Sequence, residues 1–122
     1  MITEDYVSFE VAKLLKEKGF NELTPLSYSL PYGYESYIPC SNDVDTDFVS
    51  RITLQMAMKW LMEKKGIAII PILSSILDNE KFLWDIKIVV AKTGESYSQG
   101  WIYEKQEEAF DTAIKYCLES LI

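Results

Sequence analysis

Histidine is absent from the 122 residues, and arginine occurs once, as Arg51. Without imidazole the chain lacks the commonest general base, the commonest metal ligand and any Ser-His or Cys-His nucleophile pair. The 19 acidic and 12 basic residues give a net charge of −7, which argues against binding nucleic acid through phosphate contacts. We therefore expect a protein that is not an enzyme, needs no cofactor and does not bind nucleic acid directly.

Long hydrophobic runs and cysteine frameworks are also missing. The longest mostly apolar stretch, residues 66–77, contains Pro71 and two serines. It is well short of the roughly 18 apolar residues that a membrane span requires. The N-terminus is acidic where a secretory signal would be positive, and two cysteines, Cys40 and Cys117, do not make a disulfide framework. The sequence thus predicts a soluble cytoplasmic protein with no membrane contact.

Length and composition predict a single globular domain over residues 1–122. Compact domains most often contain about 100–150 residues, and a hydrophobic fraction of 48% is ordinary for a folded chain. A chain of this length buries about two-thirds of the surface that its unfolded form exposes. It can therefore hold a core without disulfides or a structural metal.

Three segments have the apolar spacing of amphipathic helices. Ser8 can cap the first, over residues 9–18, and Thr53 can cap the second, over 54–65. The second has so narrow a polar side that we expect it to cross the middle of the core. The third, over 106–121, repeats apolar residues at steps of three and four.

Four segments are predicted to be strands. Residues 26–30 alternate apolar side chains with serine, which is the period-two pattern of a half-buried strand. Three further strands are expected over 67–73, 82–91 and 96–103, joined by short turns. Pro71 lies inside the first of these and favours an edge position or a bulge.

The predicted order of elements is α-β-(loop)-α-β-β-β-α. Residues 31–50 are predicted to be mostly loop, with room for a short strand around residues 35–38. Hairpin-length connections favour a mainly antiparallel sheet of three to four strands with three helices packed on it, which is an α+β fold. Antiparallel edge strands can pair between copies, so the sequence leaves a homodimer open.

Four tyrosines gather within ten positions of the loop and its preceding strand. Tyr28 lies on the alternating strand and is predicted to be buried. Tyr32, Tyr34 and Tyr37 cannot all be buried by one short loop. Tyrosine is enriched in the cores of protein interfaces, so these three are candidate partner-binding residues. The alternative is ordinary packing of an irregular loop.

An alternating acidic segment follows, with Asp43, Asp45 and Asp47. It begins like a calcium-binding loop, but Phe48 stands where the sharp turn needs glycine, and Leu54 where a bidentate glutamate belongs. A solvated acidic loop is the ordinary interpretation, and a weak divalent-cation site is the alternative.

Trp60, Trp84 and Trp101 each lie on an apolar face of a predicted element, which favours a position in the core. Single-stranded nucleic acid can stack on tryptophan, but that binding mode also needs a basic groove, and one arginine does not supply it. Cys117 falls on the apolar stripe of the last helix and is predicted to be a buried hydrophobic side chain.

Residues 9–20, 53–61, 107–109 and 113–119, in this order, resemble a family of short uncharacterised proteins. Such proteins are encoded by gut anaerobic bacteria and often by their phages and mobile elements. In that family the last helix usually opens on threonine, whereas Lys105 stands here and cannot cap. The resemblance implies a shared fold and a mobile-element origin, and it supplies no activity and no catalytic residues.

These features favour a non-enzymatic accessory or protein-interaction domain that acts through an unidentified protein partner. The alternative is an acidic inhibitor of a nucleic-acid-binding enzyme, in which carboxylates take the place of phosphates. The net charge of −7 and the phage context that the resemblance implies favour that role. A third candidate is a small enzyme or ligand-binding protein that uses carboxylates, although none of them can be paired from the sequence.

Overall fold

Side-chain caps begin the first two helices, as the sequence predicts. In the computed structural model, Ser8 Oγ accepts a hydrogen bond of 3.3 Å from the backbone N–H three residues later and starts α1 (Phe9–Glu17). Thr53 Oγ1 accepts the corresponding bond at 3.1 Å and starts α2 (Leu54–Trp60). Each cap satisfies one of the N–H groups that the first turn of a helix leaves unpaired.

The two later helices reach their predicted lengths. α3 (Gln106–Tyr116) begins after Lys105, which provides no side-chain cap. α2 and α3 each continue into a π-helical turn, η1 (Leu61–Lys65) and η2 (Cys117–Leu121). Gly66, with φ of +66°, ends η1 in the left-handed conformation that glycine adopts without strain. No helix in the described part of the chain is long and apolar enough to cross a membrane.

The first sheet is antiparallel and consists of three short strands. They are β1 (Ser27–Ser29), β2 (Tyr34–Ser36) and β3 (Phe48–Ser50), in the spatial order β2-β1-β3. β1 lies within a predicted strand, and β2 overlaps the short strand that the sequence allows. β3 falls in the segment predicted to be mostly loop, because three residues are too few to show a period-two pattern.

The second sheet contains the long hairpin that the sequence predicts. β4 (Ile67–Ile76) pairs with β5 (Phe82–Val90), which also pairs with β6 (Ser96–Ser98), and both pairings are antiparallel. β4 is an edge strand and carries a bulge beyond Pro71. The edge position that this proline predicts is therefore confirmed.

The structure describes residues 4–98 and 102–122. The predicted last strand is present as β6 and as an isolated bridge between Trp84 and Tyr103. Trp84 is half-buried, so its predicted core position is met in part. Trp101 lies outside the described residues.

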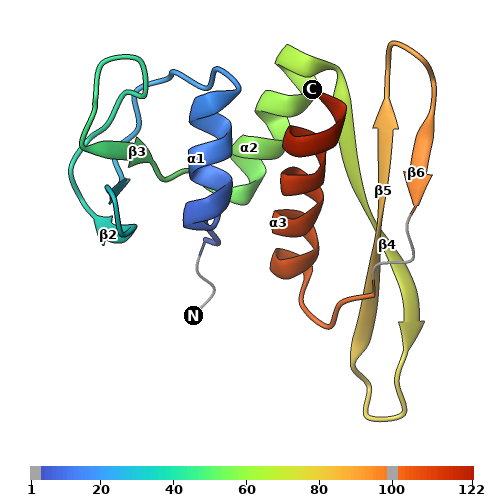
Figure 1. Cartoon of the computed structure of the whole chain (residues 1–122). Coiled ribbons are helices and arrows are strands. Elements are labelled where there is room, and N and C mark those ends of the chain that lie inside the picture. Colours follow the sequence, from blue (N-terminus) through green and yellow to red (C-terminus); the bar gives the residue numbers. More distant parts are fainter. Residues whose placement is uncertain (1–3, 99–101) are drawn as a thin grey trace.

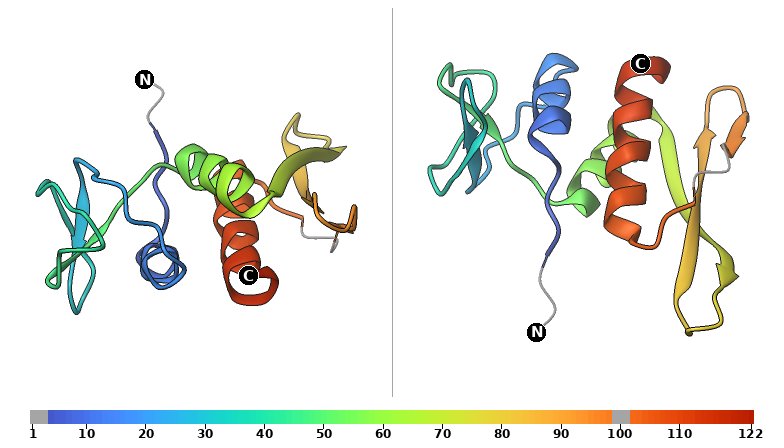
Figure 2. Two further views of the ribbon diagram at one scale, coloured as in Figure 1. Left: turned by 90° about the horizontal axis from the view of Figure 1, so that it is seen from above. Right: turned by 60° about the horizontal axis from the view of Figure 1, so that its bottom comes forward.

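The helices form a layer between the two sheets (Figure 1). Both views in Figure 2 keep the same order, with β1, β2 and β3 beside α1, and with β4, β5 and β6 beside α3. The α+β class is confirmed. The described strands, however, form two sheets instead of one. The helical layer has apolar side chains to bury on both of its sides, and each sheet covers one side.

One cluster of buried side chains fills the space between the layers. Trp60 and Cys117 belong to it, as predicted, and burial raises the pKa of the Cys117 thiol to about 12. Met56 and Met62, however, are 45% and 55% exposed. The second helix is therefore only partly in the core, because the described elements packed against it do not cover Met56 and Met62.

Candidate functional site

Three of the four clustered tyrosines are exposed to solvent and one is buried. Tyr32, Tyr34 and Tyr37 are 77%, 70% and 83% exposed, and the first two rings lie 6.1 Å apart between centroids. We call these three residues, on β2 and the turns beside it, the tyrosine surface. Tyr28 is buried, as predicted, and its hydroxyl donates a hydrogen bond to the carbonyl oxygen of Val7.

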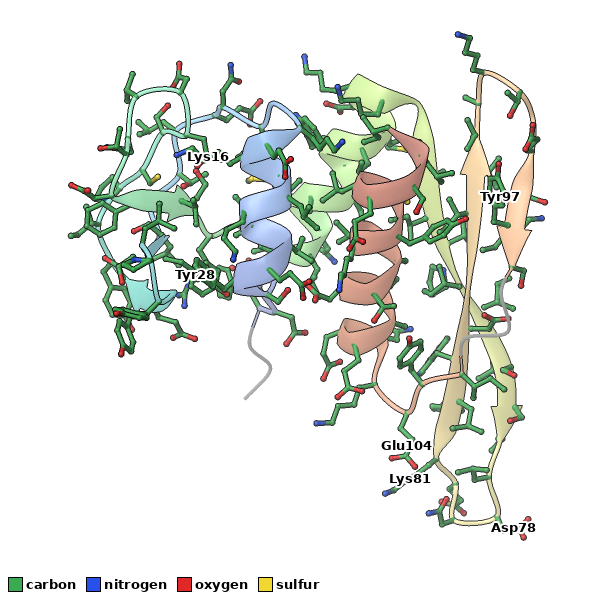
Figure 3. All side chains as sticks on the ribbon, in the orientation of Figure 1. Lys16, Tyr28, Asp78, Lys81, Tyr97 and Glu104 are labelled. Carbon is green, nitrogen blue, oxygen red and sulfur yellow. The ribbon has the colours of Figure 1, made fainter. Side chains whose placement is uncertain are left out.

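The register of the first sheet turns Tyr34 outward. Glu35 of β2 is paired with Tyr28 of β1, so these two side chains share one face of the sheet. That face lies against α1, where the Tyr28 ring contacts Phe9 with 5.6 Å between centroids (Figure 3). Because neighbouring residues of a strand point to opposite faces, Tyr34 projects from the other face into solvent.

A buried arginine holds β2 in place. Arg51 Nη1 lies 3.0 Å from Glu35 Oε2, and only 8% of the arginine side chain is exposed. Its guanidinium group lies over the rings of Tyr6 and Tyr28, at 4.6 and 5.7 Å from their centroids. Such stacking on aromatic faces fixes the cation between the N-terminal segment and the first sheet. The sequence presents Arg51 only as the single arginine and gives no signal for this role.

Gly33 allows the turn that carries Tyr32 and Tyr34. Its φ is +79°, and its N–H donates a hydrogen bond of 2.7 Å to the Ser29 carbonyl oxygen. A Cβ atom at this position would overlap the ring of Phe9. The turn therefore packs directly on α1, which fixes the tyrosine surface relative to the helical layer.

The acidic segment folds back on Ser41. The Ser41 hydroxyl donates to Asp43 Oδ1, and its backbone N–H donates to Asp45 Oδ2 at 2.7 Å. Lys16 Nζ donates to the Asp45 carbonyl oxygen at 3.0 Å (Figure 3). The Asp47 side chain is exposed. Over residues 4–98 and 102–122, no group of three or more His, Cys, Asp or Glu side chains is placed to hold a metal ion.

Asn42, directly before these acidic residues, is buried and joins distant segments. Its Nδ2 donates to the Phe20 carbonyl oxygen at 2.9 Å, and its Oδ1 accepts from the Ser50 N–H at 3.0 Å. Cys40 is fully buried close by, and burial raises the pKa of its thiol. The sequence gives no signal for this role, since an asparagine in an Asp-rich stretch is typical of a solvated turn.

Two adjoining hollows of about 380 and 350 Å³ lie where the N-terminal segment meets the start of α3. We call them the acidic groove, because carboxylates line them and, among the described residues, neither lysine nor arginine does. These carboxylates belong to Glu4, Asp5, Glu107, Glu108 and Asp111. Asp111 also accepts a hydrogen bond of 2.9 Å from the Ser8 N–H, so part of the groove supports the fold.

Comparison of the chain with protein-family models, with curated proteins and with solved structures gives no match. The resemblance to short proteins of gut bacteria and their mobile elements stays a prediction. The function is therefore proposed from the surfaces of this chain.

Proposed function

We propose that the chain is a non-enzymatic protein-interaction domain that binds one protein partner through the tyrosine surface. The observation that carries the proposal is the exposure of Tyr32, Tyr34 and Tyr37 on a support that is itself fixed. A tyrosine ring offers a large contact area with few rotatable bonds, and its hydroxyl forms hydrogen bonds at an interface.

The support lowers the entropy lost on binding. The ion pair between Arg51 and Glu35 and the packing of Gly33 on Phe9 hold β2 before a partner arrives. A surface whose backbone is already ordered loses less conformational freedom on association. We therefore expect the partner to bind without rearrangement of the first sheet.

We place this interaction in the cytoplasm. Both cysteines are free and buried, which suits a reducing compartment. The net charge of −7 keeps such a chain dissolved among other proteins.

Replacing Tyr32, Tyr34 and Tyr37 together by serine should abolish partner capture. Immobilised wild-type chain, exposed to lysate of the native host, should retain one protein at near-equal stoichiometry, and quantitative mass spectrometry should find at least about tenfold less on the variant. The free energy of unfolding should change little, because substitutions at exposed positions usually cost within about 0.5 kcal/mol each.

The matched control replaces Met56 and Met62, which are exposed on the second helix, by serine. This variant also loses exposed apolar area, so it should capture the partner as the wild type does. Equal capture by the wild type and the tyrosine variant, or no capture by the wild type, would contradict the proposal.

The acidic groove favours a second candidate function, inhibition of a nucleic-acid-binding enzyme by carboxylates that replace phosphates. Replacing Glu107 and Glu108 by glutamine should then weaken capture. Salt near 1 M should release the partner, because the Debye length falls to about 3 Å. Capture that survives both changes and is lost in the tyrosine variant would exclude this function and support the first.

A further inference from the structure

β4 and β5 extend past the start of α3 as a two-stranded arm with Asp78 at its tip (Figures 1 and 3). Every residue from 70 to 82 is exposed. Among the exposed apolar side chains of the arm, Ile70 and Ile72 project from the same face of β4 and are 44% and 37% exposed. Contiguous exposed apolar area of this kind marks an interaction surface.

One face of the second sheet is covered by the helices and the other is open. Ile86 and Ile88 of β5 are buried, and Tyr97 of β6 contacts Tyr116 of α3, so these side chains mark the covered face. The alternate residues point away from the helices, and no described element lies against them (Figure 2). This outer face presents Ile70, Ile72, Leu83, Asp85, Lys87 and Val89.

Along β5 the outer face is complementary to itself. Reading outward from Ile86, an acidic and a basic residue come first, Asp85 and Lys87, and apolar residues follow, Leu83 and Val89. Two such sheets can pack face to face, related by a two-fold axis that lies between them, runs perpendicular to the strands and crosses β5 at the level of Ile86. Asp85 then lies over Lys87 of the second copy, and Leu83 over its Val89.

The neighbouring strand obeys the same symmetry. Pro71 of β4 is paired with Ile86, so the same axis crosses β4 at Pro71 and places Ile70 over Ile72 of the second copy. Apolar side chains therefore meet on both strands, and opposite charges meet on β5. Self-complementarity of one patch is what a two-fold symmetric interface requires.

We propose that a second copy of this chain packs on the outer face of β4 and β5 and forms a two-fold symmetric dimer. Aligned packing of sheets about 10 Å apart brings the facing side chains into contact. Asp85 is already held in place, since its carboxylate accepts hydrogen bonds from the Ile86 N–H at 2.7 Å and from Ser98 Oγ at 3.2 Å. The tyrosine surface, on the other side of the helices, stays free for its own partner (Figure 1).

The free edge of β4 is poorly suited to the other mode of self-association, which is strand pairing. The Ala91 N–H donates to the Gly66 carbonyl oxygen, and because paired residues alternate in hydrogen bonding, the backbone of Ile67, Ile69 and Pro71 faces the free edge. Proline has no N–H to donate, so it interrupts that edge near its middle.

Charge reversal tests the dimer by sedimentation equilibrium over a wide range of concentration. The wild type should approach twice the 14.1 kDa mass of the chain. Asp85→Lys or Lys87→Asp alone sets like charges against each other and should weaken dimerisation about a hundredfold. The double variant, Asp85→Lys with Lys87→Asp, restores opposite charges and should recover most of the affinity.

Ile70→Lys should also give a monomer, whereas its matched control, Val44→Lys at an exposed position near the first sheet, should not. Thermal unfolding by circular dichroism checks that each variant is folded. A wild type that stays at the chain mass, or a dimer that both single reversals leave intact, overturns the proposal. A dimer that Pro71→Thr strengthens would indicate edge pairing and overturn it too.

Discussion

Replacing Phe20 by alanine is expected to lower the free energy of unfolding by about 3–5 kcal/mol, the cost typical of deleting a buried aromatic ring. Phe20 lies three residues after the end of α1, is 1% exposed, and packs edge-to-face on Trp60 with 5.8 Å between ring centroids. Its ring thereby joins α1 to α2. Domains of this size are stable by only about 5–15 kcal/mol, so the substitution should clearly lower the urea concentration at the midpoint of unfolding. Tryptophan fluorescence follows this transition.

The matched control is Phe82→Ala, which deletes the same ring at a position that is 49% exposed. This substitution should lower the free energy of unfolding by less, about 1 kcal/mol, because the half-exposed Phe82 ring buries less apolar surface than Phe20 does. Phe20→Leu, which keeps most of the volume, should cost under about 1.5 kcal/mol. Equal losses for Phe20→Ala and Phe82→Ala would show that Phe20 does not anchor the core.

Asn42→Ala is expected to lower the free energy of unfolding by about 2–6 kcal/mol. The substitution leaves the Phe20 carbonyl and the Ser50 N–H without their partner, and each buried unsatisfied group costs about 1–3 kcal/mol. The loss should appear in urea unfolding. The Ser50 amide should also exchange hydrogen faster, because its bond to Asn42 Oδ1 no longer protects it.

Asn79→Ala is the matched control, because Asn79 lies in the exposed turn of the β4–β5 hairpin. There the amide competes with water, and the change should stay within about 0.5 kcal/mol. Asn42→Asp keeps the acceptor for Ser50 but loses the donor to Phe20, so it should also be clearly destabilising. A cost below 1 kcal/mol for Asn42→Ala would contradict the bridging role of Asn42, since a single unsatisfied group exceeds it.

The exposure of the candidate tyrosine surface was predictable from the sequence, but the contacts that support it were not. Four tyrosines near one short loop exceed what that loop can bury, so the sequence separates Tyr28 from the other three by strand alternation alone. The contacts of Arg51 with Glu35 and Tyr6 depend on how β2, β3 and the N-terminal segment meet. No local sequence pattern predicts these contacts, because the residues are far apart in the chain.

Local chemistry by itself determined the helices, the long hairpin and the α+β class. Ser8 and Thr53 cap because a hydroxyl accepts a nearby backbone N–H, and Pro71 lies on an edge because it cannot donate within a sheet. Each of these constraints acts within a few residues, so the sequence contains it in full.

Only the tertiary structure decided the division of the strands into two sheets and the partners of β3. Three residues, Phe48–Ser50, form a strand because β1 lies beside them. Met56 and Met62 are exposed because no element among the described residues covers them. The same is true of the outer face of β4 and β5, which is open because the helices cover only the other face. These outcomes depend on which elements meet in space, and that follows from the packing of the whole chain.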